Sequence, residues 1–100
     1  MASTIIYKYP INVPPNGVLC IPMSRDGLEV LRLGPDPTGQ QCIWVEHDDD
    51  WVPSRPTIHH IYFEAAGFEF DPRIAVNYLG SYVDGKYVWH LYSPTLRRKR

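Results

Sequence analysis

The sequence has no long apolar run and almost no net charge. Its 100 residues carry a formal net charge of -1 at pH 7. No stretch approaches the roughly 20 apolar residues that a membrane-spanning helix needs, and the start of the chain lacks the charged and apolar segments of a secretion signal. We therefore expect a cytoplasmic protein. The small net charge also argues against a basic domain built around nucleic-acid phosphates and against an acidic mimic of DNA.

Cysteine is scarce, with only Cys20 and Cys42 in the chain. Disulfides are rare in the reducing cytosol, and a thiol within an apolar strand behaves as a small buried hydrophobe. We expect both residues to be reduced, buried and inert, with a disulfide between them as the less favoured alternative.

Motifs of the common catalytic and cofactor sites are absent. There is no G-x-S-x-G elbow, no G-x-x-x-x-G-K-[ST] phosphate loop, no H-E-x-x-H motif and no calcium-binding loop. A metal site from His47, Asp49 and either His59 or His60 is conceivable, but adjacent histidines on a strand point to opposite faces. We expect no enzyme activity, no cofactor and no bound metal, with His90 packed and the other histidines at the surface or in turns.

Long helices are excluded by ten prolines and seven glycines, which divide the chain into short pieces. Seven pieces are rich in β-branched and aromatic residues, as strands are. Leu28, Leu31 and Leu33 fit a helical turn about as well as a strand. The predicted strands cover residues 4–9, 18–23, 28–33, 41–47, 57–64, 77–83 and 86–92.

The connections between these pieces predict antiparallel pairing. Asp84-Gly85 fits the two-residue loop of a type I′ hairpin, and no connection is long enough for a parallel crossover. Asp71-Pro72 fits the start of one short helical turn. The fold class that follows is mainly β, a compact antiparallel small barrel or sandwich with at most one short helix.

Residues 1–94 are expected to form this single β domain, and residues 95–100 a mobile basic tail. The tail contains Arg97, Arg98, Lys99 and Arg100. Its charges suit a solubilising terminus or weak, salt-sensitive contact with nucleic acid.

Aromatic residues exceed what a core of this size absorbs easily, with seven Tyr, three Trp and three Phe. Trp51 lies in a polar loop directly after the acidic run Asp48, Asp49 and Asp50. Because an exposed tryptophan is a frequent anchor at interfaces, we expect Trp51 to bind a partner protein, with the aspartates as an acidic rim. The alternative is that Trp51 folds back over the sheet edge.

Tyrosines and arginines allow a second interpretation. Tyr62, Tyr82 or Tyr92 could extend the Trp51 surface or stack on a base. A ligand site would use Tyr62 with Arg55 and Arg73, assisted by Arg25 or Arg32, to hold the phosphates of a nucleotide signal. The candidate arginines and tyrosines share no motif. A concave pocket lined by aromatics and arginines would favour this interpretation, and a flat aromatic patch would favour protein docking.

Five strand segments, the third of them followed by a glycine turn, form a series along the chain. They read I-Y-K-Y-P (6–10), Q-C-I-W-V (41–45), I-H-H-I-Y-F-E-A-A-G (58–67), Y-L-G-S-Y (78–82) and V-W-H-L-Y (88–92). In this order they resemble a family of small bacteriophage and prophage proteins. The chain departs from the family because it carries His59-His60, lacks the family's G-T-G-H turn and has a basic C-terminal extension. The resemblance implies a phage origin and an accessory role directed at the host.

These features predict a non-catalytic phage accessory protein that binds a host protein, for instance a defence protein, and inhibits or redirects it. A homodimer that pairs exposed sheet edges is compatible with this function. The alternative is a protein that sequesters a nucleotide signal. A small barrel that binds nucleic acid is a third, less favoured interpretation.

Overall fold

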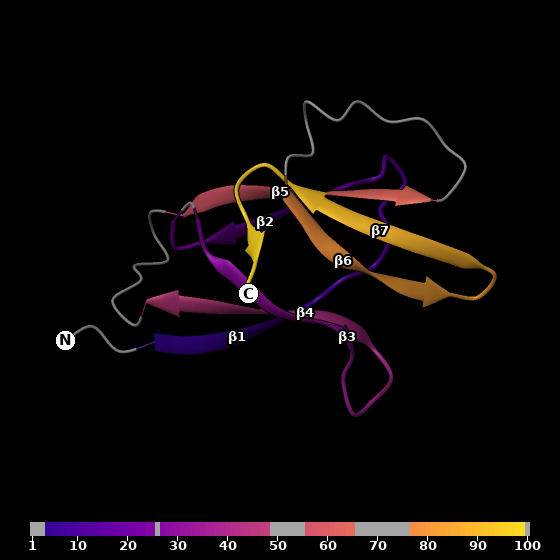
Figure 1. Cartoon of the computed structure of the whole chain (residues 1–100), viewed down its shortest axis with the longest axis horizontal. Coiled ribbons are helices and arrows are strands. Elements are labelled where there is room, and N and C mark those ends of the chain that lie inside the picture. Colours follow the sequence, from indigo (N-terminus) through magenta and orange to yellow (C-terminus); the bar gives the residue numbers. More distant parts are fainter. Residues whose placement is uncertain (1–3, 26, 49–55, 66–76, 100) are drawn as a thin grey trace.

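A computed structural model describes residues 4–25, 27–48, 56–65 and 77–99 (Figure 1). Those residues form eight strands and no helix. All seven strands predicted from the sequence are confirmed, with ends that agree within two residues. The strands are β1 (Thr4–Pro10), β2 (Val18–Met23), β3 (Glu29–Pro35), β4 (Gln41–Asp48), β5 (Thr57–Ala65), β6 (Asn77–Asp84), β7 (Tyr87–Ser93) and β8 (Arg97–Arg98).

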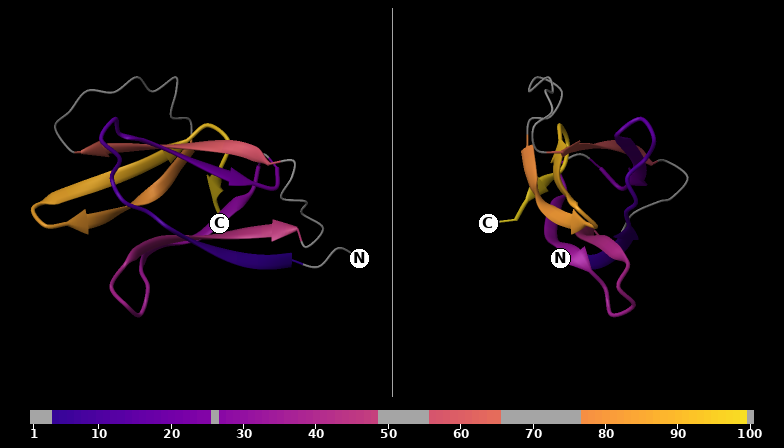
Figure 2. Two further views of the ribbon diagram at one scale, coloured as in Figure 1. Left: turned by 180° about the vertical axis from the view of Figure 1, so that it is seen from behind. Right: turned by 90° about the vertical axis from the view of Figure 1, so that its right-hand side faces the viewer.

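The strands form two four-stranded sheets. Sheet A has the order β1-β4-β3-β8, and sheet B has the order β2-β5-β7-β6. Figure 2 shows the two sheets as layers, with β1 and β4 in one and β2 and β5 in the other. The fold is therefore mainly β and resembles a sandwich, which decides between the two predicted architectures. Every strand pair is antiparallel except β3 with β8.

Period-two alternation places the core between the sheets. In β5, His59, Ile61 and Phe63 are buried, whereas Ile58 and His60 are exposed. The same alternation in the other strands supplies a continuous cluster of apolar side chains. Its members are Ile11, Ile21, Met23, Leu28, Val30, Ile43, Val45, Ile61, Phe63, Leu79, Tyr82, Leu91 and Leu96.

The pairing of the strands decides two local expectations. The segment with Leu28, Leu31 and Leu33 is a strand, as predicted, and not the alternative helical turn, because it pairs with β4 from Glu29 to Pro35. The β6–β7 hairpin has Gly85 and Lys86 in its loop, since Asp84 pairs with Tyr87. Gly85 has φ +58° and no described non-glycine residue has positive φ. This combination fits a type II′ turn and not the expected type I′ turn, which needs positive φ at both positions.

The C-terminal segment is a second correction. Leu96 is completely buried, and Arg97–Arg98 pairs with β3 as β8. The Lys99 amide also donates to the Val30 carbonyl at 2.9 Å. Residues 95–99 therefore belong to the β domain, because one apolar side chain anchors an otherwise basic segment. The expected helical turn at Asp71-Pro72 lies outside the described residues.

A β-bulge in β6 lies where the two sheets come close together. The register shifts between Tyr78 and Gly80, and Gly80 has φ +139°. A Cβ atom at Gly80 would lie 3.1 Å from Cδ2 of Leu33 in β3. The glycine thus serves both the backbone conformation and the contact between sheets.

Gly80→Ala is expected to lower the free energy of unfolding by about 2–4 kcal/mol, because it combines backbone strain with overpacking against Leu33. Gly39→Ala is the control: Gly39 has φ +90° but no atom within 4 Å of its Cβ position, so only the strain of about 1–2 kcal/mol remains. Urea unfolding of both variants measures the difference. Equal losses would contradict the packing role of Gly80.

Asp36 organises the loop between β3 and β4. Its side chain is 6% exposed and pairs with Nζ of Lys8 at 3.0 Å. Its Oδ1 atom accepts hydrogen bonds from the Thr38 hydroxyl at 2.6 Å and from the amides of Thr38 and Gln40 at 2.8 and 3.1 Å. The hydrogen bond from the Thr38 hydroxyl has the largest effect on Asp36 and the contact with Lys8 the next largest. Together they hold the pKa of Asp36 far below its usual value.

Because the pKa of the Asp36 carboxyl is lower in the folded state than in the unfolded state, its ionised form stabilises the fold at pH values above the unfolded-state pKa. This contribution is lost as the pH falls through the folded-state pKa. Asp36→Asn should therefore unfold at lower urea concentration than the parent near pH 7, and the gap should narrow below about pH 4. Asp84→Asn, which makes the same change at an exposed hairpin position, is the control. A gap for Asp36→Asn that is independent of pH would contradict this role.

Candidate functional site

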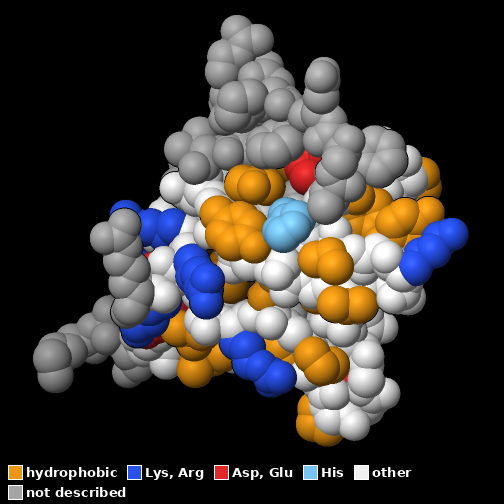
Figure 3. Space-filling model, turned by 45° about the vertical axis from the view of Figure 1, so that its right-hand side comes forward, with side chains coloured by type: hydrophobic (Ala, Val, Ile, Leu, Met, Phe, Trp, Pro, Cys, Tyr) orange, Lys and Arg blue, Asp and Glu red, His pale blue; other side chains and the backbone are white. Residues whose placement is uncertain are grey.

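The outer face of sheet B presents several exposed apolar side chains, among them Ile58, Tyr78, Val83 and Val88. We define it by the side chains that point away from the core along the four strands, as burial and register place them. They are Val18, Cys20, Pro22, Ile58, His60, Tyr62, Glu64, Tyr78, Ser81, Val83, Val88, His90 and Tyr92. Figure 3 brings the β6–β7 part of this face forward and shows hydrophobic side chains gathered around a histidine.

Aromatic side chains form a row across this face. Tyr92 pairs in register with Tyr62 on one side and with Tyr78 on the other. The rings of Tyr78 and Tyr92 have centroids 5.2 Å apart. The Tyr78 hydroxyl lies 3.1 Å from Nδ1 of His90, whose ring is 5.9 Å away. Cross-strand contacts of this kind fix the rings, so the row is preorganised.

Charge distinguishes this face from the opposite one. Among the described residues, Glu64 is the only carboxylate on the sheet B face, and no lysine or arginine lies there. Burial raises the pKa of Glu64. The outer face of sheet A instead carries Lys8 and Arg32, and the Arg32 guanidinium covers the Trp44 ring at 4.6 Å. An apolar centre with few charged side chains is typical of interaction surfaces.

The sequence-predicted interface residues are placed only in part. Asp48 is the last residue of β4, and Trp51, Asp49 and Asp50 lie outside the described residues. Trp51 and its acidic rim therefore stay a prediction. The same holds for Arg55 and Arg73 of the alternative ligand site, which also lie outside the described residues.

The tyrosines proposed as companions of Trp51 separate into two groups. Tyr62 and Tyr92 are neighbours on the outer face of sheet B. Tyr82 is 7% exposed and meets Phe63 edge-on in the core, with centroids 6.4 Å apart. Burial also raises the pKa of Tyr82 to about 12. Tyr82 is therefore a core residue. The tyrosine of β6 that belongs to the surface row is Tyr78.

The cysteines are both free, and their environments differ. Cys42 is completely buried, as expected, and burial raises the pKa of its thiol. Cys20 is exposed on the outer face of sheet B, which corrects the expectation of a buried thiol. The residue points outward because it alternates with the buried Ile21 and pairs with His60.

The histidines overturn the expectation that only His90 packs in the domain. His47 and His59 are 1% and 0% exposed. Nε2 of His47 meets the Tyr9 hydroxyl at 2.8 Å, and Nδ1 meets the Ser24 hydroxyl at 3.1 Å. Burial raises the pKa of Tyr9 to about 12. The period-two alternation of β4 could have predicted the burial of His47, because His47 is on the same face of the strand as the buried Ile43 and Val45.

His59 joins the C-terminal segment to the β2–β3 connection. Its Nε2 donates to the Arg25 carbonyl at 2.8 Å, because a carbonyl only accepts. Its Nδ1 lies 2.6 Å from the Thr95 hydroxyl. His60, the next residue, is exposed on the other face, as expected for adjacent strand residues.

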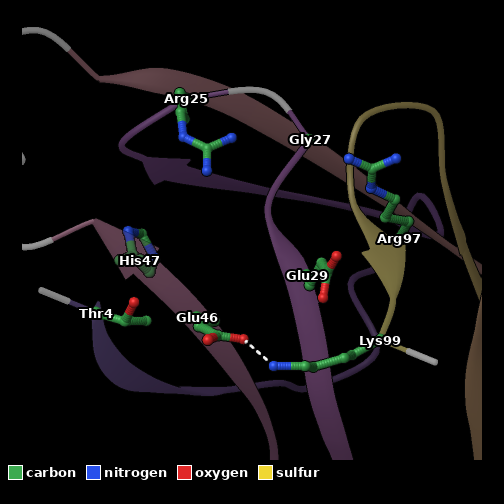
Figure 4. Close-up of a pocket in the computed structure, with 8 residues that line it drawn as sticks. All are labelled: Thr4, Arg25, Gly27, Glu29, Glu46, His47, Arg97 and Lys99. Atoms are coloured by element: carbon green, nitrogen blue, oxygen red, sulfur yellow. Dashed lines mark hydrogen bonds and ion pairs between the residues drawn. The ribbon is translucent and has the colours of Figure 1, made fainter. Parts of the chain in front are cut away.

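Two hollows also lie at the sheet margins. A groove of about 300 Å³ between β3 and β6 is lined by Arg32, Arg98 and Tyr78. A polar cleft of about 250 Å³ is lined by Arg25, Gly27, Glu46 and Arg97, among others (Figure 4). In the described part of the chain, no group of three His, Cys, Asp or Glu residues could hold a metal ion. That part also contains no helix long and apolar enough to cross a membrane.

Comparison with known proteins identifies a family but no activity. The family model described as a domain of unknown function, DUF7352, matches residues 2–100. No curated protein and no solved structure matches the chain.

Proposed function

We propose that this chain, which belongs to the DUF7352 family, is a non-catalytic binding protein that docks on another protein through the outer face of sheet B. The observation that carries the proposal is the row of Tyr62, Tyr92 and Tyr78 across three neighbouring strands. Tyrosine contributes large contact area with little conformational entropy loss and is enriched at interface hot spots.

The partner is a protein whose matching surface is apolar at its centre and basic or neutral at its rim. Glu64 supports this choice, because it is the only charged side chain among the described residues of the face and would repel an acidic surface. The resemblance of the strand segments to phage proteins supports a host protein as the partner, encountered in the host cytoplasm and inhibited or redirected by binding. The acidic run Asp48, Asp49 and Asp50 would extend the same preference for a basic rim.

A capture experiment with matched variants tests the proposal. Tyr78→Ala removes an exposed ring from the docking face, and Ile6→Ala removes a side chain of similar exposure from sheet A. A host protein captured by the parent should bind Tyr78→Ala about 30-fold more weakly, as is typical of interface hot spots. Its affinity for Ile6→Ala should be unchanged. Capture lost equally in both variants, or in neither, would overturn docking through this face.

Trp51→Ala belongs in the same series. If the loop before β5 adds an anchor to the docking face, this variant should weaken capture of the same protein by a similar factor. Unchanged capture would remove Trp51 from the interface and leave the tyrosine row as its centre.

The groove between β3 and β6 favours a second candidate function, binding of a nucleotide-like ligand. Two arginines and one tyrosine line it, which is the combination that stacking and phosphate contacts require. Arg32 already donates to the Pro35 carbonyl at 3.1 Å and covers Trp44. Because Arg32 already makes these two contacts within the protein, protein docking is the better supported function.

A further inference from the structure

β1 forms a free edge of sheet A, because it pairs with β4 on one side only (Figure 1). The Ile11 amide donates to the Gln41 carbonyl at 2.9 Å, and the register with β4 is unbroken along the whole of β1. Since inward and outward hydrogen-bonding residues alternate along an antiparallel strand, Thr4, Ile6 and Lys8 direct their amides and carbonyls away from β4. Within the described residues, no hydrogen bond reaches these backbone groups. β1 is therefore ready to pair with a further strand.

The edges formed by β8, β2 and β6 are each protected against such pairing. β8 consists of Arg97–Arg98 alone. In β2, Pro22 has no amide, and the Val18 amide donates to Oδ1 of Asn16 at 3.2 Å. β6 carries the bulge at Gly80. Short length, charge, proline and bulges are the devices that keep sheet edges from pairing, and β1 has neither a bulge nor an interior proline.

The side chains of β1 also favour contact with another strand. Ile5 and Ile6 are 40% and 58% exposed, on opposite faces of the strand. Lys8 is the only charged residue of β1, and its Nζ pairs with Asp36 at 3.0 Å. The lysine that could protect this edge is thus neutralised within the protein. Pairing with a further strand would remove apolar surface from water and satisfy the free backbone groups.

We propose that β1 pairs antiparallel with β1 of a second copy of this chain, across a two-fold axis at Ile6, so that the two copies of sheet A become one continuous sheet. Ile6 then faces its own copy, and Thr4 faces the partner's Lys8. Each of these pairs exchanges two backbone hydrogen bonds, and no like charges meet.

Other positions of the two-fold axis are less favourable. An axis at Lys8 would bring two lysines together, which destabilises a strand pair. An axis one residue from Ile6 would place Thr4 opposite Pro10, which has no amide, or Lys8 opposite a residue before β1. The hydrogen-bonding pattern and the charges of β1 therefore agree on the axis at Ile6, and a second copy is the partner that this pattern fits.

This dimer is separate from the docking face and does not rest on it, because β1 belongs to sheet A and the docking face to sheet B. The hydrogen bonds between the copies come from the backbone. Ile6→Ala keeps these bonds and adds no charge, so it should still dimerise. The dimer presents two docking faces, one from each copy.

Analytical ultracentrifugation of the parent and of two lysine variants tests the dimer. We expect the parent to reach twice the 11.6 kDa of one chain as its concentration rises. Ile6→Lys should weaken dimerisation at least about tenfold, because it opposes two lysines across the axis and removes the contact between two isoleucines. Ile58→Lys is the matched control, since Ile58 is 47% exposed on sheet B, and it should dimerise like the parent.

Three results would overturn the proposal. One is a parent that stays monomeric at about 1 mM, where even a weak dimer forms. Another is a dimer that Ile58→Lys disrupts and Ile6→Lys does not, which would place the contact on sheet B. The third is a monomeric parent whose captured host protein is lost in Ile6→Lys, which would assign the edge to a strand of that protein.

Disulfide crosslinking tests the register without adding a charge. In a Cys20→Ser background, which leaves the buried Cys42 as the only native thiol, Ile6→Cys places two thiols opposite each other across the axis. Their Cα atoms would lie about 5.5 Å apart, within disulfide range. Thr4→Cys is the control, because its two copies would lie about 14 Å apart along the strands. Mild oxidation should link the Ile6→Cys chains and not the Thr4→Cys chains. Equal linking of both, or of neither, would contradict the two-fold axis at Ile6.

Discussion

Replacing His59 by alanine is expected to lower the free energy of unfolding by about 3–5 kcal/mol, a large share of the 5–15 kcal/mol typical of a small domain. The ring is completely buried, and both of its nitrogens are hydrogen-bonded within the protein. The substitution leaves a cavity and deprives the Arg25 carbonyl of its donor. Urea unfolding of the two proteins measures the change.

His60→Ala is the matched control, since the neighbouring histidine is exposed on the outer face of sheet B. It should change the free energy of unfolding by less than about 0.5 kcal/mol. His59→Leu separates the two contributions, because it fills most of the space without replacing the hydrogen bonds. Similar stability of His59→Ala and His60→Ala would show that the buried histidine does not join the C-terminal segment to the β2–β3 connection as described.

Leu96→Ala is expected to cost about 2–5 kcal/mol, although the residue lies only four positions from the end of the sequence. Leu96 is completely buried, and its carbonyl accepts a hydrogen bond from Nδ2 of Asn77 at 2.9 Å. Loss of its side chain should also release β8 from β3. Chemical unfolding again provides the measurement.

Arg98→Ala is the control within the same segment, because its side chain is exposed. Its effect should stay within about 0.5 kcal/mol. If Leu96→Ala is as stable as Arg98→Ala, Leu96 does not anchor the segment, and the segment is the mobile tail that its charge suggests. The free energy of unfolding of Leu96→Ala, compared with that of Arg98→Ala, thus distinguishes an anchored C-terminal segment from a mobile one.

The strands could be predicted from the sequence because period-two alternation is a local property. Ile61 and Phe63, for example, alternate with exposed residues in the same strand. The arrangement of strands into two sheets could not be predicted, since it depends on pairings such as β3 with β8, which join distant residues. Turn type was missed for a related reason: the register of the hairpin moved the loop by one residue.

The candidate site was predictable only where alternation reports the face of a strand. Tyr62 and Tyr92 share the outer face because they pair across β5 and β7. Tyr82 resembled them in composition, but the bulge at Gly80 shifts the phase of β6, and Tyr82 enters the core. Leu96 was overlooked because the basic residues after it dominate the composition of the segment.

Photo-crosslinking from Cys20 tests docking through the outer face of sheet B most directly. Cys20 is exposed on that face and Cys42 is completely buried, so a thiol-reactive photo-crosslinker attaches at the intended position. The comparison protein carries Cys20→Ser and Ile6→Cys, which moves the crosslinker to sheet A. We predict that a host protein is crosslinked from Cys20 and not from position 6, and that Tyr78→Ala abolishes the product. Equal crosslinking from both faces, or a product that persists in Tyr78→Ala, would contradict the account.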